Sequence, residues 1–373
     1  MTKTNFQRLI DLKLLLSVEG IGPVKIRSLL TKLHSLEAVL SADFHTLIKI
    51  EGINSTLAKK IIRVKDNRNS MEEQLHKEIE KLVKLGGRII TIWDKEFPTL
   101  LKKIYDPPLL LYVKGSFNEN DNYSISIVGT RQPSNYGKIQ AERFASESAG
   151  QNITIVSGLA RGIDTTAHSA AIKASGRTFA ILGCGLDVIY PPENRKIFNE
   201  IANSGMVISE YELGTKPDAP NFPRRNRIIS GISLGTIVIE TAATGGAMQT
   251  ASFALDQNRE VFAIPGNLGI KQSEGTNLLI QKGEAKLVRE PDDIIYELEY
   301  KLKPVLGIKT EKPMPELTIF EEKITACLSS EPTHIDKISQ LTSLSISDCL
   351  VHLLTLEFKG VIKQLPGKMF ALM

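Results

Sequence analysis

The most constraining feature of this 373-residue sequence is a series of short apolar runs between residues 86 and 300. Most runs precede a loop with glycine or proline, and then a segment of helical pattern. Near-continuous apolar strands that alternate with helices are typical of a parallel sheet covered on both faces. We therefore predict an α/β fold with a Rossmann-like, doubly wound and mostly parallel sheet. The predicted strands are SISIVG, ITIVSG, TFAILG, MVISEY, GTIVIE, EVFAIPG and AKLV, and GRIITIW and PLLLYVKG extend an edge.

Residues 1–85 form the first predicted domain, a set of short helices with a weak internal repeat. The segments SVEGIGPVKIRSLL and KIEGINSTLAKKII share the tripeptide Glu-Gly-Ile. A glycine turn before a helix is typical of the helix-hairpin-helix motif, whose backbone N–H groups approach a DNA phosphate. The first copy keeps both glycines, whereas the second has Asn54 in place of the second one. A helical domain that serves only packing or protein contacts explains the pattern equally well.

The C-terminal part of the chain divides into a predicted linker, 301–316, and a predicted winged-helix domain, 317–373. The linker has four lysines and three prolines between Lys301 and Leu317 and little periodicity. Three helical patterns and two short strands around a Pro-Gly turn then resemble a winged helix. Its expected recognition helix, SISDCLVHLLTLEFKG, has few basic residues and much leucine. Reading of DNA bases needs polar and basic side chains, so the pattern favours a protein-contact module.

Composition limits the kinds of site that the chain can hold. Its net charge is only +4, so a site for a polyanion must come from local clustering of basic residues. No CxxC or HxxxH spacing occurs, and we expect neither a metal site nor a disulfide framework. No P-loop is present, and GCGLDV has Val188 where a dinucleotide fingerprint has its last glycine, so no cofactor is predicted. The absence of a signal layout and of a long apolar run predicts a cytoplasmic protein without membrane contact.

Four loops that follow predicted strands carry the strongest functional signal. Glycine turns at helix starts expose N–H groups and a partial positive charge, and arginine adds a planar fork that suits phosphate. The carboxyl ends of parallel strands meet at one edge of a sheet, so these loops predict a polyphosphate site there. The candidate residues are Gly129, Thr130 and Arg131; Ser157, Gly158 and Arg161; Gly183, Gly185, Asn194 and Arg195; and Thr244, Gly245 and Gly246. Asp164 is a predicted N-cap of the helix after the second loop.

The stretch NFPRRNRIISGIS places Arg224, Arg225 and Arg227 in the first turn of a predicted helix. The helix dipole disfavours cations there by about 0.3–1 kcal/mol each, so an anion or an acidic partner must compensate. Phe222 precedes the arginines and can stack on a nucleic-acid base, which contributes about 1–3 kcal/mol. The alternative is an ion-pair network with acidic residues of the preceding loop, Glu210, Glu212 and Asp218.

These motifs together resemble the DNA-processing protein A (DprA, Smf) family. The stretches SIVGTR, VSGLARGIDTTAH, ILGCGLDVIYPPEN, ISEY, FPRRNRIISGIS, VIETAATGGAMQTASFALDQNREVFAIPGN and GTNLLIQKGEA occur in the order found in that family. The resemblance is strong over about 115–290, and it extends to an N-terminal sterile-alpha-motif-like (SAM-like) or helix-hairpin-helix domain and a C-terminal winged helix. It implies a bacterial, non-catalytic protein that dimerises through the Rossmann-like domain and binds single-stranded DNA without sequence preference. It also implies loading of the RecA recombinase during natural transformation (competence).

The resemblance assigns DNA contacts to individual residues. It carries the arginine of the GTR motif over to Arg131, and it assigns the SGLARG loop to Ser157, Gly158 and Arg161. A basic residue often follows Tyr-Pro in the family, and here Arg195 stands three positions further on. The FPRRNR motif supplies the remaining contacts, which are Phe222, Arg224, Arg225 and Arg227, with Asn226 between them.

Two alternatives remain open on the sequence alone. Lysine-decarboxylase-like (LOG) nucleoside-monophosphate hydrolases share glycine-rich loops and a glutamate near a GGxGT loop, which ETAATGGAMQT partly resembles. Here Ala247 and Met248 interrupt that motif, and no other catalytic set stands out. A transcription factor built around the winged helix is the second alternative, and it would prefer a particular duplex sequence.

Overall fold

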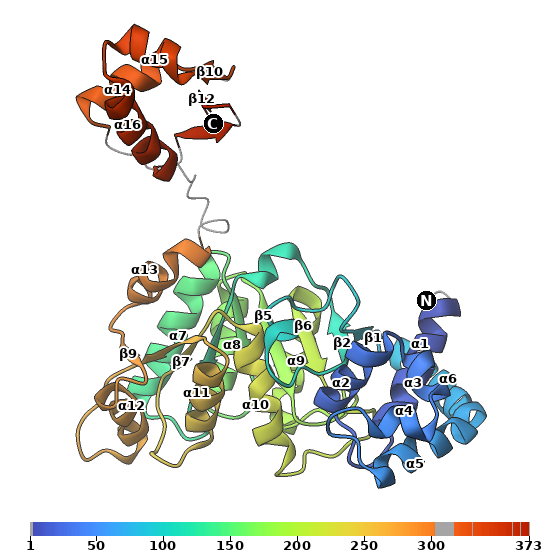
Figure 1. Ribbon diagram of the computed structural model, residues 1–373. Coiled ribbons are helices and arrows are strands. Elements are labelled where there is room, and N and C mark those ends of the chain that lie inside the picture. The colour runs from blue at the N-terminus through green and yellow to red at the C-terminus, as the bar shows by residue number, and fades with distance from the viewer. Residues whose placement is uncertain (1–2, 303–316, 330, 360, 366, 373) are drawn as a thin grey trace. The chain divides into compact units, whose positions relative to one another are not determined.

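The computed structural model describes residues 3–302, 317–329, 331–359, 361–365 and 367–372. The chain forms two compact units, residues 1–308 and 309–373 (Figure 1). The predicted boundaries after residues 85, 300 and 316 remain predictions. The predicted linker lies outside the described residues, except for 301–302, which end a helix. No helix of the described part is long and apolar enough to span a membrane.

The first unit begins with a bundle of short helices that packs on one end of a β-sheet. Its apolar core is shared with the sheet, because Leu9, Ile61 and Leu82 belong to the same buried cluster as Tyr112 and Val207. The helices are α1 (Lys3–Leu16), α2 (Pro23–Leu33), α3 (Leu36–Ser41), α4 (Phe44–Ile48), α5 (Ser55–Val64) and α6 (Arg68–Lys84), with the short 3₁₀ turn η1 (Lys65–Asn67).

The helices that follow the two predicted helix-hairpin-helix turns are capped in different ways. Helix α2 begins after Gly22, which caps it without a side chain, whereas the Asn54 side chain accepts the Leu57 N–H at the start of α5. Gly20 and Gly52 both adopt a positive φ, which allows the tight turn that precedes each helix. In the second copy a side chain of the turn therefore accepts one of the N–H groups at the helix start. In the first copy no side chain of the turn does so.

Nine strands of the described residues form one sheet in the order β1-β2-β6-β5-β4-β3-β7-β8-β9. All neighbours from β6 to β9 pair in parallel, and β1 and β2 add two antiparallel pairs at one edge. The strands are β1 (Gly87–Thr91), β2 (Leu110–Gly115), β3 (Ser124–Val128), β4 (Thr154–Ser157), β5 (Thr178–Leu182), β6 (Met206–Ser209), β7 (Gly235–Val238), β8 (Glu260–Ala263) and β9 (Lys286–Leu287).

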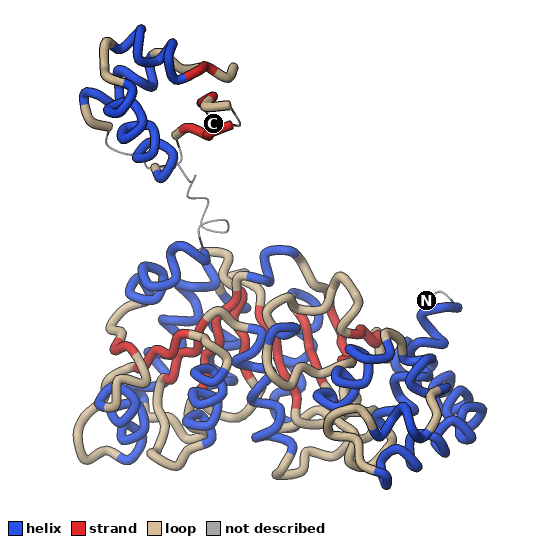
Figure 2. The backbone as a smooth tube through the Cα atoms, in the orientation of Figure 1, coloured by secondary structure: helices blue, strands red, loops and turns tan. Residues whose placement is uncertain are grey.

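Helices cover both faces of this sheet (Figures 1 and 2). Buried residues of α7 and α8 pack on one face together with Ile125 and Ile127, and residues of α10 and α11 pack on the other together with Val128 and Val238. The helices are α7 (Asn135–Gly150), α8 (Ile163–Lys173), α9 (Arg195–Ser204), α10 (Asn221–Ile232), α11 (Gly246–Asp256), α12 (Lys271–Gln281) and α13 (Pro291–Leu302), with the 3₁₀ turns η2 (Leu101–Lys103), η3 (Glu119–Asn122) and η4 (Pro192–Asn194).

This topology confirms the predicted doubly wound α/β fold. Every apolar run singled out in the sequence forms a strand, and the two runs that precede the regular alternation form the antiparallel edge. The strand order reverses at β3, because the chain moves outward through β4, β5 and β6 and then returns to place β7 on the other side of β3. Ligands of such sheets collect outside the carboxyl ends of the strands at this switch point.

The second unit has the elements of a winged helix. Three helices enclose an apolar core with a three-stranded sheet in the order β10-β12-β11. Its elements are α14 (Ile319–Ala326), β10 (Thr333–His334), α15 (Ile335–Thr342), α16 (Ile346–Phe358), β11 (Ile362–Leu365) and β12 (Met369–Leu372). The exposed side of α16, the expected recognition helix, carries the apolar side chains Ile346, Leu350, Val351 and Leu354.

A nearly buried ion pair between two helices of the bundle also bonds to the sheet and generates a first prediction. Lys13 contacts the carboxylate of Glu78 and lies 3.2 Å from the hydroxyl of Tyr112 on β2. We expect Lys13→Ala to lower the free energy of unfolding by about 3–5 kcal/mol, because it leaves the Glu78 carboxylate nearly buried without its cation. Chemical denaturation of the purified chain measures this change.

Lys60→Ala is the matched control, since the Lys60–Glu19 pair is exposed and such pairs contribute about 0–1 kcal/mol. Equal effects of the two substitutions would contradict a stabilising role for the Lys13 pair.

Candidate nucleic-acid interface

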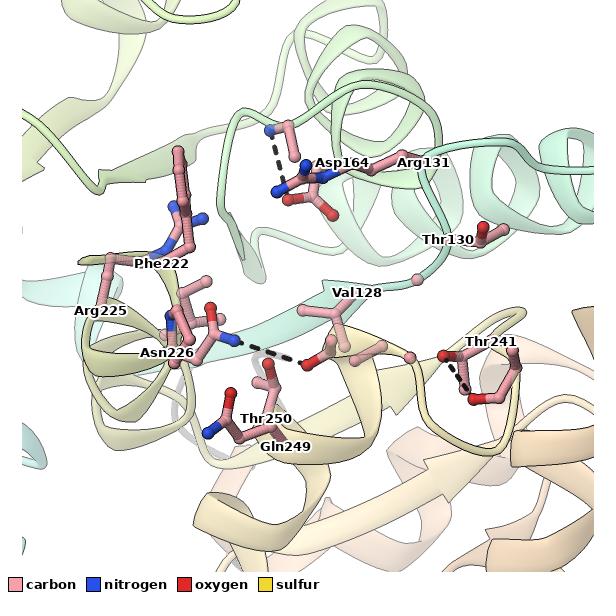
Figure 3. Close-up of a pocket in the computed structure, with 18 of the residues that line it drawn as sticks. Val128, Thr130, Arg131, Asp164, Phe222, Arg225, Asn226, Thr241, Gln249 and Thr250 are labelled. Carbon is pink, nitrogen blue, oxygen red and sulfur yellow. Dashed lines mark hydrogen bonds between the residues drawn. The ribbon is translucent and has the colours of Figure 1, made fainter. Parts of the chain in front are cut away.

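A cavity of about 770 Å³ lies at the switch point of the sheet (Figure 3). We call it the switch-point pocket. Its walls come from the loop after β3, the loop and helix start after β7, and the first turns of α10. Its lining residues are Val128, Gly129, Thr130, Arg131, Gln132, Ala160, Asp164, Tyr190, Pro217, Ala219, Phe222, Pro223, Arg225, Asn226, Ile229, Thr241, Ala242, Gly245, Gly246, Ala247, Gln249 and Thr250.

Phe222 forms the aromatic wall of this pocket. Its ring centroid lies 5.8 Å from that of Tyr190, and the guanidinium of Arg131 lies 5.4 Å from its ring. Gly183 lies under the ring, because a Cβ at that position would come within 3.0 Å of Phe222. The glycine of the GCG loop thus makes room for the aromatic ring, and the guanidinium groups of Arg131 and Arg225 lie 5.4 and 6.0 Å from the ring centroid.

Arg131 is the exposed cation of the pocket. Among the described residues, it has no carboxylate within ion-pair distance and no hydrogen-bond acceptor. Its location at the end of β3 follows from the short GTR turn, in which Thr130 N–H donates to the Glu240 carbonyl at 2.7 Å. The guanidinium therefore faces the pocket with its donors available to an external anion.

The start of α11 offers bare backbone amides on the β7 side of the pocket. Gly245 caps this helix without a side chain, and the N–H groups of Gly246 and Ala247 have no acceptor among the described residues. Nothing lies within 4 Å of a Cβ built on Gly246. Such amides, together with the partial positive charge of a helix start, are typical of anion sites.

Arg225 lies beneath the pocket and is only 4 % exposed. Its Nη1 donates to the Gly158 carbonyl at 2.7 Å and also to the Ile181 carbonyl. A Cβ at Gly158 would lie 2.6 Å from the guanidinium, so the glycine of the SGLARG loop makes this approach possible. Burial lowers the pKa of Arg225, and the nearby Asp164 carboxylate opposes that shift. Arg225, which lies in the second turn of α10 rather than in the predicted first turn, therefore attaches this helix to the ends of β4 and β5.

The other two arginines of the FPRRNR motif point away from the pocket. Arg227 is buried, donates to both carboxylate oxygens of Glu210 at 2.6 and 2.7 Å, and lies 3.4 Å from Asp106. It thus forms the ion-pair network that was the alternative interpretation, with Glu210 as the anticipated partner. Arg224 is exposed and lines a separate cavity beside the glycine turn that precedes α2.

The remaining candidates divide between the pocket and its surroundings. Arg161 and Gly158 line a narrow cleft that adjoins Phe222, and Arg161 forms an exposed ion pair with Glu193. Ser157 is buried, and its Oγ donates to the Ile127 carbonyl at 2.6 Å. The exposed residues Arg195 and Thr244 lie outside the lining of the switch-point pocket. Asn226 lines it and contacts the Gly246 carbonyl at 3.5 Å.

For two residues of the pocket, Tyr190 and Asp164, the sequence did not predict the observed role. Tyr190 was not a candidate, although an aromatic residue before Pro-Pro in a loop at a strand end could have been noted. Asp164 was expected to be an N-cap, but Gly162 occupies that position and Asp164 lies inside the first turn of α8. Its carboxylate instead accepts the N–H groups of Gly158 and Ala160 at 3.1 and 3.3 Å. It thus fixes the loop on which Arg225 rests.

A buried acid and a buried histidine lie behind the pocket. Burial raises the pKa of Asp164 to about 6, although Arg225 and the two N–H donors lower it. Burial also lowers the pKa of His168 to about 3, and Arg225 adds to that shift. His168 Nδ1 bonds to Thr178 Oγ1 at 2.7 Å, and its Nε2 has no partner among the described residues. Neutral His168 therefore serves as packing.

Comparisons with known proteins agree with this arrangement. The family model described as DNA recombination-mediator protein A matches residues 88–299, the DprA winged helix domain matches 309–368, and a SAM-like helix-hairpin-helix tandem matches 12–64. Protein Smf of Synechocystis is 34 % identical over 94 % of this chain and 95 % of its own length.

Two solved structures are similar to the chain. The X-ray structure of DNA processing protein A from Streptococcus pneumoniae has a TM-score of 0.66 and 34 % identity, and covers 80 % of this chain and 99 % of that one. A structure of DNA processing protein A from Helicobacter pylori, solved in a study of its single-stranded DNA binding mode, has a TM-score of 0.52 and 31 % identity. It covers 57 % of this chain and 97 % of that one.

The opposite pKa shifts of Asp164 and His168 generate a pH prediction. The folded-state pKa of Asp164 lies above its unfolded value of about 4, so its stabilisation is present below pH 4 and lost as the pH rises through 6. The folded-state pKa of His168 lies below its unfolded value of about 6.5, so its stabilisation is lost on acidification. The two contributions oppose each other between about pH 4 and 6.

We expect Asp164→Asn to remove the contribution of Asp164 to the pH dependence of stability and to leave that of His168 unopposed. On acidification from pH 6 to 4, its free energy of unfolding should fall by about 1.4 kcal/mol per pH unit more than that of the unchanged chain. Urea unfolding at four pH values measures both slopes, and Asp256→Asn, at an exposed position, is the control. Parallel slopes for Asp164→Asn and the unchanged chain would contradict the raised pKa.

Proposed function

Because the chain belongs to the DNA recombination-mediator protein A family, we propose that it binds single-stranded DNA without sequence preference in the switch-point pocket. As a mediator it protects incoming strands and loads a RecA-type recombinase onto them during natural transformation. The Helicobacter pylori relative, whose structure concerns its single-stranded DNA binding mode, supports the choice of ligand. The recombinase and the transformation context follow from the resemblance to the family.

The observation that carries this proposal is the exposed guanidinium of Arg131 near the ring of Phe222, with bare amides at the start of α11 in the same pocket lining. A phosphate of the strand bonds to Arg131, and a neighbouring phosphate reaches the N–H groups of Gly246 and Ala247. A base stacks on Phe222, with Tyr190 at its side. Phosphate and stacking contacts carry no base identity, so the pocket does not select a sequence.

The same geometry favours a single strand over a duplex. A base can reach the face of Phe222 only when it is unpaired and unstacked, because the ring lies inside a pocket rather than on a flat surface. The exposed face of α16 is apolar, which does not suit a reader of duplex grooves. The winged helix is therefore proposed as a protein-contact module rather than as the DNA-binding part of a transcription factor.

The hydrolase alternative depends on Glu240, the glutamate near the glycine-rich loop after β7. Glu240 is 3 % exposed and does not line the switch-point pocket. Its carboxylate accepts the backbone N–H and the Oγ–H of Ser134 at 2.9 and 2.5 Å, which fixes the start of α7. A carboxylate held in this way cannot reach a substrate in the pocket, so the geometry supports binding without catalysis.

We also propose that two copies associate through an apolar patch of the Rossmann-like domain. Leu268 is 90 % exposed, and Ile270 and Leu278 lie beside it around a cavity of about 490 Å³. Large exposed apolar side chains in one patch are typical of a protein interface. A dimer places two switch-point pockets on one strand, and the second contact then forms at a high effective concentration.

Arg131→Ala should weaken binding of fluorescein-labelled oligo(dT) by about tenfold or more at low salt, because a charge-assisted hydrogen bond contributes about 1.5–3 kcal/mol. The slope of log affinity against log salt should fall by about 0.7, since one phosphate contact is lost. Fluorescence anisotropy at two salt concentrations measures both quantities, with single- and double-stranded oligonucleotides compared.

Lys77→Ala is the control, because it removes one exposed positive charge from α6, outside the pocket lining. If Arg131→Ala keeps the affinity and salt slope of the unchanged chain, the assigned pocket is wrong.

Leu268→Glu should convert the dimer into a monomer in sedimentation experiments, because burial of two carboxylates in an apolar interface opposes association. Val351→Glu, the same kind of change at an exposed apolar residue of the other compact unit, should leave the dimer intact. A monomeric unchanged chain, or a dimeric Leu268→Glu variant, would refute this interface.

A further inference from the structure

A second groove lies at the antiparallel edge of the sheet, in a different part of the chain from the switch-point pocket. It has a volume of about 520 Å³ and lies between the edge strand β1 and the helices α1 and α6, which Figure 1 shows at the same end of the sheet. We call it the edge groove. Its lining residues are Asn5, Arg8, Ile79, Leu82, Val83, Gly87, Arg88, Ile89, Ile90, Thr91, Asp94, Lys95 and Glu96.

Strand β1 presents unused backbone groups to this groove. In an antiparallel pair, residues alternate between bonding to the partner strand and pointing away from it. Ile92 N–H bonds to the Leu109 carbonyl in register, so Ile90 also faces β2, whereas Gly87 and Ile89 face outward. Among the described residues, the backbone groups of Gly87 and Ile89 that face outward have no partner. An edge strand of this kind is a template for pairing with another chain.

The strand edge is closed at one end only. The Asp94 carboxylate accepts the outward Thr91 N–H at 2.6 Å and the Thr91 hydroxyl at 2.8 Å. Gly87 is itself buried, so pairing with an added strand is limited to Ile89, which lines the groove. A limited open edge suits a short peptide better than it suits a long strand of another sheet.

The helix side of the groove is apolar. Ile79, Leu82 and Val83 of α6 line it, and Val83 is 63 % exposed although it stands beside a buried leucine. Leu82 packs so closely on the strand that a Cβ at Gly87 would lie 2.7 Å from it. Strand and helix thus form two walls, one with hydrogen-bonding groups and the other with apolar side chains.

The charged side chains that line the groove carry a small positive excess. Glu96 bonds to Arg88 at 2.7 and 2.9 Å, whereas the Asp94 carboxylate accepts hydrogen bonds from the neutral Thr91 groups and keeps its charge. Within the described part of the chain, Arg8 and Lys95 have no acidic partner. The guanidinium of Arg8 instead lies 4.8 Å from the ring of Trp93.

We propose that the edge groove binds an extended acidic peptide segment of a partner protein, which adds a short strand to β1. Backbone groups of the peptide pair with Ile89, alternate apolar side chains rest on α6, and carboxylates meet Arg8 and Lys95. Strand addition with pockets for alternate side chains is a general mode of peptide recognition. An apolar wall and only two free cations do not suit a nucleic-acid strand, which requires a continuous basic surface.

The experiment uses the full chain and the fluorescence of Trp93, the only tryptophan of the sequence. The probe is a capped heptapeptide, Asp-Val-Thr-Val-Thr-Val-Asp, because strand residues alternate between two faces. We expect a saturable change of Trp93 emission below about 1 mM peptide, the range of weak specific binding. Hydrogen exchange of the segment 87–91 should slow at the same concentrations.

Two modified peptides test the two parts of the proposal. N-methylation of alternate backbone amides removes the donors needed for pairing, and lysine in place of aspartate reverses the charge. Both changes should abolish binding. No saturation by the parent peptide, or equal binding of the N-methylated one, would overturn strand addition.

Val83→Glu tests the location, because it places a carboxylate on the apolar wall at an exposed position that tolerates the change. It should lower the affinity for the heptapeptide at least tenfold and leave the affinity for oligo(dT) unchanged. Val351→Glu in the other compact unit should change neither affinity. An unchanged peptide affinity would overturn the site. A shift of the oligomeric state caused by Val83→Glu would assign the groove to a second copy of the chain instead and would also overturn the proposal.

Discussion

The buried guanidinium of Arg225 fixes the geometry on which the rest of the site depends. From the second turn of α10 it donates to carbonyl groups at the ends of two neighbouring strands, β4 and β5. An arginine in this position is costly, since burial disfavours its charge. The Asp164 carboxylate and the strand carbonyls compensate that cost, and Phe222 on the same helix is thereby held over the switch point.

This arrangement divides the arginines of the region by role. Arg225 and Arg227 are buried and bond to carbonyl and carboxylate groups of the chain itself, so they position α10 rather than offer charge to solvent. Arg131, on a separate loop, keeps its guanidinium exposed beside the aromatic ring. The cations that position α10 thus differ from the cation that we propose as a DNA contact. A basic sequence motif alone would not have separated them, because charge is the same in both settings.

Much of the fold could be predicted because its signals are local. Apolar strands with helices between them specify a parallel sheet, and the topology rule then places the loops after β3 and β7 at one switch point. The burial of Arg225 also has a local signal in the sequence. It precedes Ile228, Ile229 and Ile232 by three, four and seven residues, which places it on the buried stripe of α10.

Other parts of the site depend on contacts between distant segments. Asp106, which lies near Arg227, comes from a loop more than a hundred residues earlier, and no spacing rule connects them. Tyr190 reaches the pocket only because the loop after β5 folds back toward Phe222. The edge groove likewise forms between α6 and β1, and the sequence shows neither its open backbone groups nor which of its charges are compensated.

Crosslinking of a photoreactive oligonucleotide to the full chain tests the central claim most directly. A 5-iodouracil oligo(dT) is irradiated in the complex, and the modified peptides are identified by mass spectrometry. Crosslinks to Phe222 and Tyr190 are expected, because a base stacked in the switch-point pocket lies against these rings. Crosslinks confined to the helix-hairpin-helix turns or to α16, with none in the pocket, would contradict the account.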